Sequence, residues 1–134
     1  MPPWLYSQTI TLRPARPADI AARFAIGPEP DNNLRLYGVD PATAQPFTME
    51  RAEYWTKSLI DHPYAWVIER DGLLGSARLD RVDFVDRRAS FAIGLLQSKN
   101  IGKGIGTEAT RAVLTYAFSE LKLHRGVASS VGDQ

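Results

Sequence analysis

The sequence predicts a single α/β (α+β) domain with a mostly antiparallel central sheet and flanking helices. The order of the segments indicates this class: a strand and two helices come first, then three strands, then a long amphipathic helix. Short turns join the three strands, and this favours antiparallel pairing because a parallel pair needs a longer crossover. No repeat or linker divides the chain, so residues 1–134 are treated as one domain.

The composition excludes several classes of protein. Sixteen basic and 15 acidic residues are too balanced to indicate nucleic acid or an anionic membrane as the partner. The chain has no cysteine, which excludes disulfides, thiolate zinc sites and cysteine nucleophiles. No apolar run approaches the roughly 20 residues of a membrane span. Residues 1–12 lack the pattern of a secretory signal, so a cytoplasmic protein is expected.

The N-terminal part predicts one strand and two helices. Residues 9–12 have the composition of a strand, and Pro17 suits the first turn of the short helix that follows. Residues 27–45 are rich in proline, glycine and polar residues, which predicts a long surface segment of the kind that often lines a substrate entrance. Thr48 is expected to cap a second helix, which ends near Pro63.

The middle of the chain predicts a three-stranded meander. Its strands are residues 64–69, 73–82 and 89–96. In the third strand, large apolar side chains alternate with small ones, so the two kinds fall on opposite faces. The large ones are Phe91, Ile93 and Leu95, and the small ones are Ser90, Ala92 and Gly94.

A long amphipathic helix follows the polar loop at residues 97–103. Its polar stripe consists of Glu108, Arg111, Thr115, Ser119 and Lys122. Its apolar side consists of Ile105, Ala109, Ala112, Val113, Tyr116 and Leu121. Glu108 and Arg111 have the spacing of a pair across one helical turn.

The segment that carries chemistry is residues 100–109, Asn-Ile-Gly-Lys-Gly-Ile-Gly-Thr-Glu-Ala, between the third strand and this helix. The three alternating glycines lack Cβ atoms, so a bulky anion can approach the backbone closely. The first amides of a helix have no partner within it, and together with the helix dipole they suit a pyrophosphate. Lys103 adds a positive charge and Thr107 a hydroxyl donor.

Other interpretations of these glycines fit less well. An NTPase P-loop requires Gly-Lys-Ser/Thr at its end, whereas Ile105 follows Gly104. A dinucleotide-binding motif requires Gly-x-Gly-x-x-Gly within a parallel strand-helix-strand unit, and both the spacing and the strands differ here. From the glycines alone, a simple turn that begins a helix remains a valid alternative.

The loop and helix resemble the coenzyme A signature of GNAT acetyltransferases, Gln/Arg-x-x-Gly-x-Gly/Ala, with Gly104 and Gly106 at the two small positions. The sequence of residues 102–109 is similar to the corresponding sequence in the branch of the family that includes ribosomal-protein-alanine acetyltransferases. Leu12-Arg13-Pro14 with Asp19, and residues 116–118 and 121–125, also match that branch. The resemblance extends over residues 9–125. Ile101 departs from it, since it occupies the Gln/Arg position.

The resemblance implies an acyl-CoA N-acyltransferase fold and transfer of an acetyl group from acetyl-CoA to a primary amine on a protein N-terminus or a small molecule. It places the pyrophosphate on the loop and the pantetheine arm beside the third strand. It implies no metal. It also suggests that Gly94 marks a bulge in the third strand. The implied coenzyme A-binding residues are Gly94, Leu95, Leu96, Ile101, Gly102, Lys103, Gly104, Ile105, Gly106 and Thr107.

The same resemblance leads us to expect that the chain lacks the family's last strand-helix-strand elements. Those elements usually supply an Asn that contacts coenzyme A and a Tyr that protonates the leaving thiolate, and the residues after Arg125 offer neither. Residues 127–131 are expected to form at most a short strand. The open sheet edge would be completed by a second copy or another chain, or the sequence is a fragment. A catalytically impaired acyl-CoA-binding module is therefore the alternative function.

No catalytic base follows from the sequence. His124 and His62 are expected at a helix end and in a loop, with structural roles. Four acids lie on or after the meander strands, where a base would face a cleft, but each is expected to be a solvated charge. They are Glu69, Asp80, Asp83 and Asp86.

Overall fold

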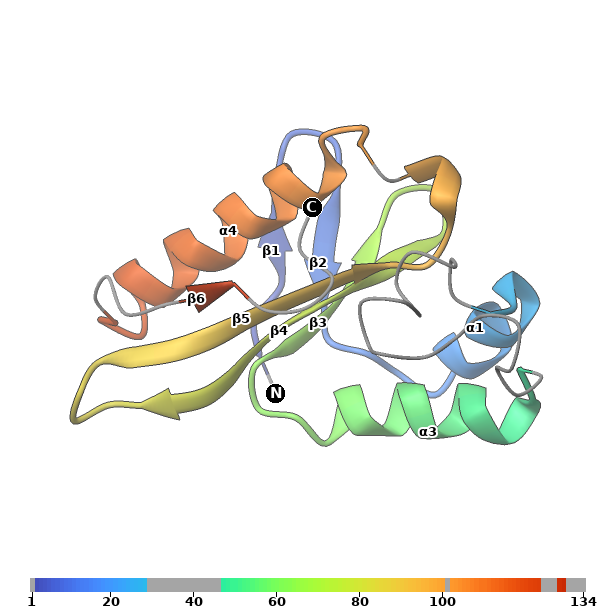
Figure 1. Ribbon diagram of the computed structural model, residues 1–134, viewed down its shortest axis with the longest axis horizontal. Helices are drawn as coiled ribbons and strands as arrows, with labels where there is room; N and C mark the ends of the chain where they lie inside the picture. Colours follow the sequence, from blue (N-terminus) through green and yellow to red (C-terminus); the bar gives the residue numbers. More distant parts are fainter. Residues whose placement is uncertain (1, 29–46, 101, 124–127, 130–134) are drawn as a thin grey trace.

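The computed structural model describes residues 2–28, 47–100, 102–123 and 128–129 (Figure 1). Within these residues, one sheet contains six strands in the order β1-β2-β3-β4-β5-β6. The strands are β1 (Leu5–Tyr6), β2 (Thr11–Arg13), β3 (Ala65–Glu69), β4 (Leu73–Asp83), β5 (Arg88–Leu95) and β6 (Ala128–Ser129). The helices are α1 (Asp19–Ile26), α3 (Met49–Ile60), the 3-10 helix η2 (Ser98–Asn100) and α4 (Ile105–Ser119).

The sheet is antiparallel from β1 to β5, and only β5 and β6 pair in parallel. The mostly antiparallel arrangement predicted from the sequence is therefore confirmed. β1 was not predicted, because two residues are too few to show the alternation of a strand. Ala128–Ser129 falls inside the segment expected to form a short strand.

Two apolar clusters cover the opposite faces of the sheet, and β3 shows the division. Trp66 and Ile68 belong to the cluster that contains the buried residues of α4, whereas Ala65 and Val67 pack with residues of α1 and α3. Successive side chains of a strand point to opposite faces, so both faces of β3 are covered. Figure 1 shows α4 and α3 on opposite sides of the strands.

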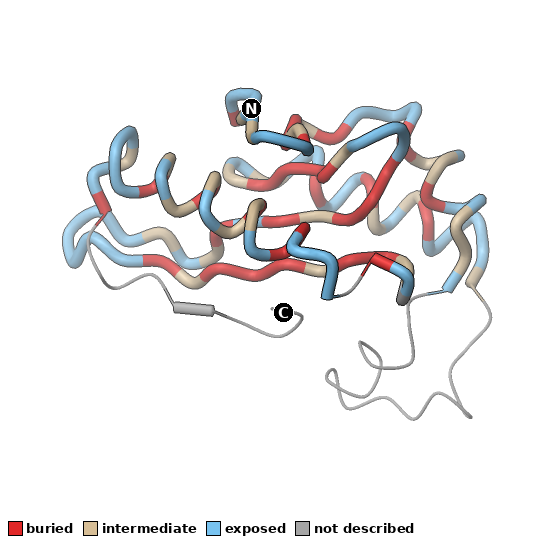
Figure 2. The backbone as a smooth tube through the Cα atoms, turned by 90° about the horizontal axis from the view of Figure 1, so that it is seen from above, coloured by how far each residue is buried: buried red, intermediate tan, exposed pale blue. Residues whose placement is uncertain are grey.

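α4 buries the apolar side predicted for it, and the large side chains of β5 lie in the same cluster. The fully buried positions are Ile105, Ala109 and Val113, together with Ala117. The other predicted positions are partly buried: Ala112, Tyr116 and Leu121. In Figure 2 the buried positions run along the central strands, while the turns are exposed. This packing fixes the N-terminus of α4 beside the end of β5.

The turn between β1 and β2 is tied to the first turn of α4. β2 begins at Thr11 rather than at residue 9, because the Thr9 amide and hydroxyl donate to the Glu108 carboxylate at 3.1 and 3.0 Å. Among the described residues, Glu108 binds Thr9 rather than forming an ion pair with Arg111. Burial by itself would raise the pKa of Glu108, but the hydrogen bonds from Thr9 lower it overall.

Arg13 of β2 is buried and binds two carboxylates. Its Nη1 and Nη2 atoms donate to both oxygens of Asp19 at 3.0 and 2.8 Å. Its Nε and Nη2 atoms also donate to Glu69 at 3.1 and 3.0 Å. A guanidinium that donates in pairs fixes the orientation of its partners. Arg13 thus joins β2, the start of α1 and the end of β3.

The bulge predicted at Gly94 is wrong. β4 and β5 keep one register from Gly75↔Leu95 to Asp80↔Ser90, and the register shifts only between Asp80 and Asp83. A Cβ atom on Gly75 would lie 2.1 Å from the Gly94 carbonyl oxygen. The missing side chain of Gly75 therefore permits a close approach of the two backbones without an extra residue in β5.

Candidate functional site

The glycine-rich loop before α4 has a left-handed backbone at two positions. Gly102 has a φ of 80° and Gly104, the N-cap of α4, a φ of 84°. A Cβ atom at either position would meet no other atom within 4 Å. The backbone conformation, and not a lack of space, therefore favours glycine at both positions.

The first turn of α4 presents amides that the helix itself does not use. The Glu108 amide donates to the Gly104 carbonyl at 3.0 Å. The amides of residues 105–107 precede that bond, and Gly104 has no side chain that could accept from them. With the positive end of the helix dipole, they form a site suited to a phosphate group.

The predicted loop residues fall into two groups. Gly102, Lys103, Gly104 and Thr107 are exposed. Ile105 and Gly106 are buried, so they offer a ligand only their backbone. Ile101 lies outside the described residues.

Asn100, immediately before the loop, is buried. Its side-chain Nδ2 atom has no hydrogen-bond partner among the described residues. An unpaired buried donor is costly, so this nitrogen is suited to an acceptor group supplied from outside the described part of the chain. The sequence did not single out this side chain.

The strand before the loop, β5, has an uneven outer edge. β6 pairs with it only at Ser90 and Phe91. Among the described residues, no strand pairs with the outer edge of residues 92–94. The opposite edge of these residues pairs with β4.

The backbone of β5 divides its hydrogen-bonding groups between its two edges. The Leu96 amide donates to the Leu74 carbonyl at 3.0 Å, and the Leu96 side chain is buried with α1 and α3. Since the direction alternates along an antiparallel ladder, Gly94 also faces β4, whereas Ile93 and Leu95 face the outer edge. Of the three strand residues predicted to contact a ligand, Leu95 is the one whose backbone faces that edge.

Three polar side chains, those of His62, Asp80 and Arg78, form a cluster on the α3 side of the sheet. The His62 Nε2 atom lies 2.8 Å from Asp80 Oδ1, and the Arg78 Nε atom donates to Asp80 Oδ2 at 2.8 Å. The His62 Nδ1 atom accepts from the Tyr64 amide at 3.0 Å. His62 lies in a loop, as predicted, but Asp80 is a partner in a network rather than an isolated solvated charge. A separation of 18 residues hides this contact from the sequence.

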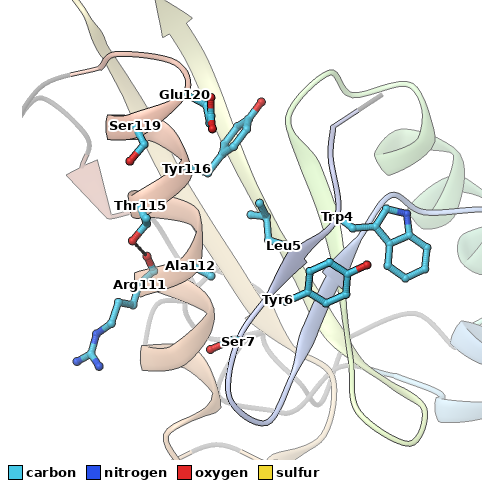
Figure 3. Close-up of a pocket in the computed structure, with 10 residues that line it drawn as sticks. All are labelled: Trp4, Leu5, Tyr6, Ser7, Arg111, Ala112, Thr115, Tyr116, Ser119 and Glu120. Atoms are coloured by element: carbon cyan, nitrogen blue, oxygen red, sulfur yellow. Dashed lines mark hydrogen bonds between the residues drawn. The ribbon is translucent and has the colours of Figure 1, made fainter.

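A separate groove of about 560 Å³ runs between β1 and the C-terminal half of α4 (Figure 3). The rings of Trp4 and Tyr6 stack on its β1 side with centroids 6.3 Å apart. Leu5 and Tyr116 also line it. It lies along residues 111–119 of α4 and the following Glu120, whereas the glycine loop lies before residue 105, so the two are distinct.

The described part of the chain has neither a membrane-spanning helix nor a cluster of metal-binding side chains. None of its helices has the length and apolarity required to cross a bilayer. No cluster of three or more histidine, cysteine or acidic side chains within it is arranged to hold a metal ion.

The sequence matches the Acetyltransferase (GNAT) domain family over residues 9–132. It is 30% identical over 128 residues to "Probable N-acetyltransferase YjcK" of Bacillus subtilis, covering 90% of this chain and 71% of that protein. It is 31% identical over 103 residues to "Putative ribosomal N-acetyltransferase YdaF" of the same organism, covering 74% and 55%. The structure resembles the spermidine N-acetyltransferase of Vibrio cholerae in complex with CoA and spermine, with a TM-score of 0.57, 23% identity and coverages of 87% and 68%.

The chain belongs to the GNAT family of acetyltransferases. Members of this family use acetyl-CoA as the acetyl donor and an amine as the acceptor. The fold inferred from the resemblance, an acyl-CoA N-acyltransferase sheet with flanking helices, is confirmed. The chain spans 71% and 55% of the lengths of its two Bacillus subtilis relatives.

Proposed function

We propose that this chain binds acetyl-CoA at the glycine loop and the outer edge of β5, and transfers the acetyl group to a primary amine. The uncapped, glycine-led N-terminus of α4 is the observation that carries the proposal. It offers the amides of residues 105–107 to the pyrophosphate. Lys103 adds a nearby positive charge, and Thr107 adds a hydroxyl donor. Gly102 and Gly104 keep the approach free of side chains.

The pantetheine arm would run back from the loop along the outer edge of β5. Ile93 turns its backbone groups toward this edge, and Gly94 contributes a small surface. Leu96 lies next to the arm but cannot donate to it, because the Leu96 amide already donates to the Leu74 carbonyl. The arm is an amide-bearing chain, so it can form the hydrogen bonds of an added strand. Its thioester end then lies toward Ser90 and Phe91, where β6 pairs with β5.

The identity of the amine acceptor is less well defined than that of the acetyl donor. The name of YdaF mentions ribosomal acetylation, and the Vibrio cholerae enzyme was crystallised with spermine. A protein N-terminus and a polyamine both present a primary amine, so either class is compatible with direct attack on the thioester. Residues 27–45, the surface segment predicted to line a substrate entrance, lie largely outside the described residues.

Turnover tests the proposal. The purified chain should release free thiol from acetyl-CoA when a primary amine is present, with spermidine and a peptide bearing a free N-terminus as the first acceptors. Binding of acetyl-CoA without thiol release from any amine would instead identify an acyl-CoA-binding module.

A Gly104→Val variant tests the location of the site. Valine at a φ of 84° is strained, and its branched Cβ would stand where the phosphates approach. We expect acetyl-CoA affinity to fall at least tenfold, a loss of about 1.4 kcal/mol. Gly27→Val is the matched control, because Gly27 has a φ of 88°, equally open surroundings and a position after α1. Equal loss of affinity in both variants would show that the effect is a general one on stability.

A further inference from the structure

Asn100 is a buried polar residue whose side-chain nitrogen has no partner in the described part of the chain. The residue is 9% exposed, and its Nδ2 atom meets no acceptor there. The backbone of Asn100 is used locally, because its amide donates to the Gln97 carbonyl at 3.0 Å. A buried nitrogen without an acceptor costs free energy, so a structural role does not account for this side chain.

Other buried polar side chains form hydrogen bonds within the fold. The Thr56 hydroxyl donates to the Ala52 carbonyl at 2.9 Å, and the Arg13 guanidinium donates to both oxygens of Asp19. The folded chain itself therefore satisfies these groups. Asn100 differs from them, and its carboxamide is better explained by an acceptor that a ligand brings.

The position of Asn100 connects its side chain with the proposed pyrophosphate site. Asn100 ends η2, and only residues 101–103 separate it from Gly104, the N-cap of α4. Four residues span at most about 14 Å when fully extended. The span is shorter here, because the positive φ angles of Gly102 and Gly104 are not those of an extended chain. A diphosphate held by the amides of residues 105–107 therefore lies close to Asn100.

The loop offers few other side-chain donors at this end. Ile101 and Gly102, which follow Asn100, have no polar side chain. Lys103 is exposed, so solvent and salt weaken its attraction for an anion. The carboxamide nitrogen carries two N–H groups, and a bond from it to a phosphate oxygen would be charge-assisted and sheltered from water.

We propose that Asn100 is a coenzyme A-binding residue whose Nδ2 atom donates to a pyrophosphate oxygen of acetyl-CoA. This inference rests on the proposed function, because it adds a donor to the same site. The last side-chain torsion of asparagine is broad, so the nitrogen can turn toward the ligand at small cost. Binding of acetyl-CoA then satisfies a donor that the protein alone leaves buried without an acceptor.

Asn100→Leu and Asn100→Asp test the inference by calorimetric titration of acetyl-CoA. Leucine has nearly the same shape but cannot donate, so we expect the affinity to fall at least tenfold, as for a lost bond to a charged group. Aspartate places a second anion beside the phosphates, so the affinity should fall by about 100-fold. The ligand-free Asn100→Leu protein should melt at the temperature of the parent or above it, because the substitution removes an unsatisfied donor.

Asp19→Asn is the matched control, since it changes a buried polar side chain that has partners within the fold. It should lower the melting temperature of the ligand-free protein and leave the affinity for acetyl-CoA unchanged. Asn100→Leu should have the opposite pattern. This contrast distinguishes a side chain that binds a ligand from one that only supports the structure.

NMR of the Asn100 side-chain amide identifies the part of the ligand that accepts the hydrogen bond. Its signals should shift when acetyl-CoA is added, and also with ADP, which carries a diphosphate. They should not shift with pantetheine, which has no phosphate. A response to pantetheine and not to ADP would contradict the assignment to the pyrophosphate.

Two further results would overturn the inference. One is unchanged acetyl-CoA affinity in Asn100→Leu. The other is a fall in its ligand-free melting temperature as large as that of Asp19→Asn, which would show that Asn100 has a partner within the fold. A parent chain that binds no acetyl-CoA would instead contradict the proposed function.

Discussion

At the scale of single residues, buried charges organise the N-terminal part of the fold. The side chains of Arg13 and Asp19 are only 3% and 5% exposed, and they form two hydrogen bonds with each other. A buried charge that loses its partner is costly, because neither water nor another group replaces that partner. Asp19 also accepts from the Arg16 amide at 2.9 Å, so one carboxylate fixes both β2 and the start of α1. Leu12-Arg13-Pro14 and Asp19 resemble the family, and the contact between Arg13 and Asp19 gives this resemblance a structural basis.

Asp19→Asn should lower the free energy of unfolding by about 3–5 kcal/mol, because it leaves the Arg13 charge buried with one partner fewer. Urea denaturation followed by circular dichroism measures this change. Glu53→Gln, which removes an exposed partner of Lys57, is the control and should change the free energy by less than about 1 kcal/mol. Similar effects of the two substitutions would contradict the structural role of Asp19.

The same carboxylate should contribute to acid sensitivity. Burial by itself would raise the pKa of Asp19, but the hydrogen bonds from Arg13 and Arg16 lower it overall in the folded state. A lowered pKa means that this stabilisation is present above the pKa of the unfolded chain and is lost as pH falls through the folded-state value. Stability measured from pH 6 down to pH 2 should therefore fall less steeply in Asp19→Asn than in the parent. An identical slope would show that Asp19 does not contribute.

Gly75→Ala is expected to destabilise the protein by about 1–3 kcal/mol, the usual cost of overpacking. The new methyl group would lie 2.1 Å from the Gly94 oxygen and 3.1 Å from the Leu95 Cα atom, and backbone atoms cannot move aside as flexible side chains do. Thermal unfolding measures the loss. Ser76→Ala, the adjacent position of β4, should have little effect. A parent-like melting temperature for Gly75→Ala would mean that β4 and β5 separate easily.

At the scale of elements, the two long helices begin in different ways. Thr48 caps α3 as predicted, since its hydroxyl accepts from the Arg51 amide at 3.2 Å. α4 begins at a glycine with no side-chain cap. A cap satisfies the amides within the protein, whereas its absence leaves them for a ligand. The contrast supports a structural role for the start of α3 and a binding role for the start of α4.

Thr48→Ala should cost about 1 kcal/mol of stability, because it removes the acceptor for the Arg51 amide. It should not alter acetyl-CoA affinity, which calorimetry can establish on the same sample. Thr48→Ser keeps the hydroxyl and should retain most of the stability. A loss of affinity in Thr48→Ala would connect α3 to the donor site and contradict this separation.

The sequence predicted the elements better than the contacts between them. The meander strands were placed within about one residue, because their apolar positions alternate and glycine or charged turns separate them. The partners of Glu108 and Asp80 were missed, since they come from positions 99 and 18 residues away. Gly75 was missed because its role depends on a carbonyl of the neighbouring strand. The glycine-led start of α4 agrees with the sequence, because the features that begin a helix are local.

At the scale of the whole molecule, α4 and α3 cover opposite faces of the sheet. The proposed pyrophosphate site lies at the N-terminus of α4, and the network of His62, Asp80 and Arg78 lies on the face opposite to α4. The outer edge of β5 runs from the glycine loop to Ser90 and Phe91, where β6 pairs with it. The antiparallel order β1 to β5 brings these groups together without a crossover.

The most direct test of the central claim is a calorimetric titration of acetyl-CoA into the purified 134-residue chain, with ATP and NAD titrated in parallel. We expect saturable binding of acetyl-CoA with a stoichiometry of one per chain, and at least tenfold weaker binding of both nucleotides. Comparable affinity for all three would show that the α4 N-terminus binds phosphate groups without recognising the pantetheine arm. An absence of acetyl-CoA binding by a folded, monodisperse sample would contradict the proposed site.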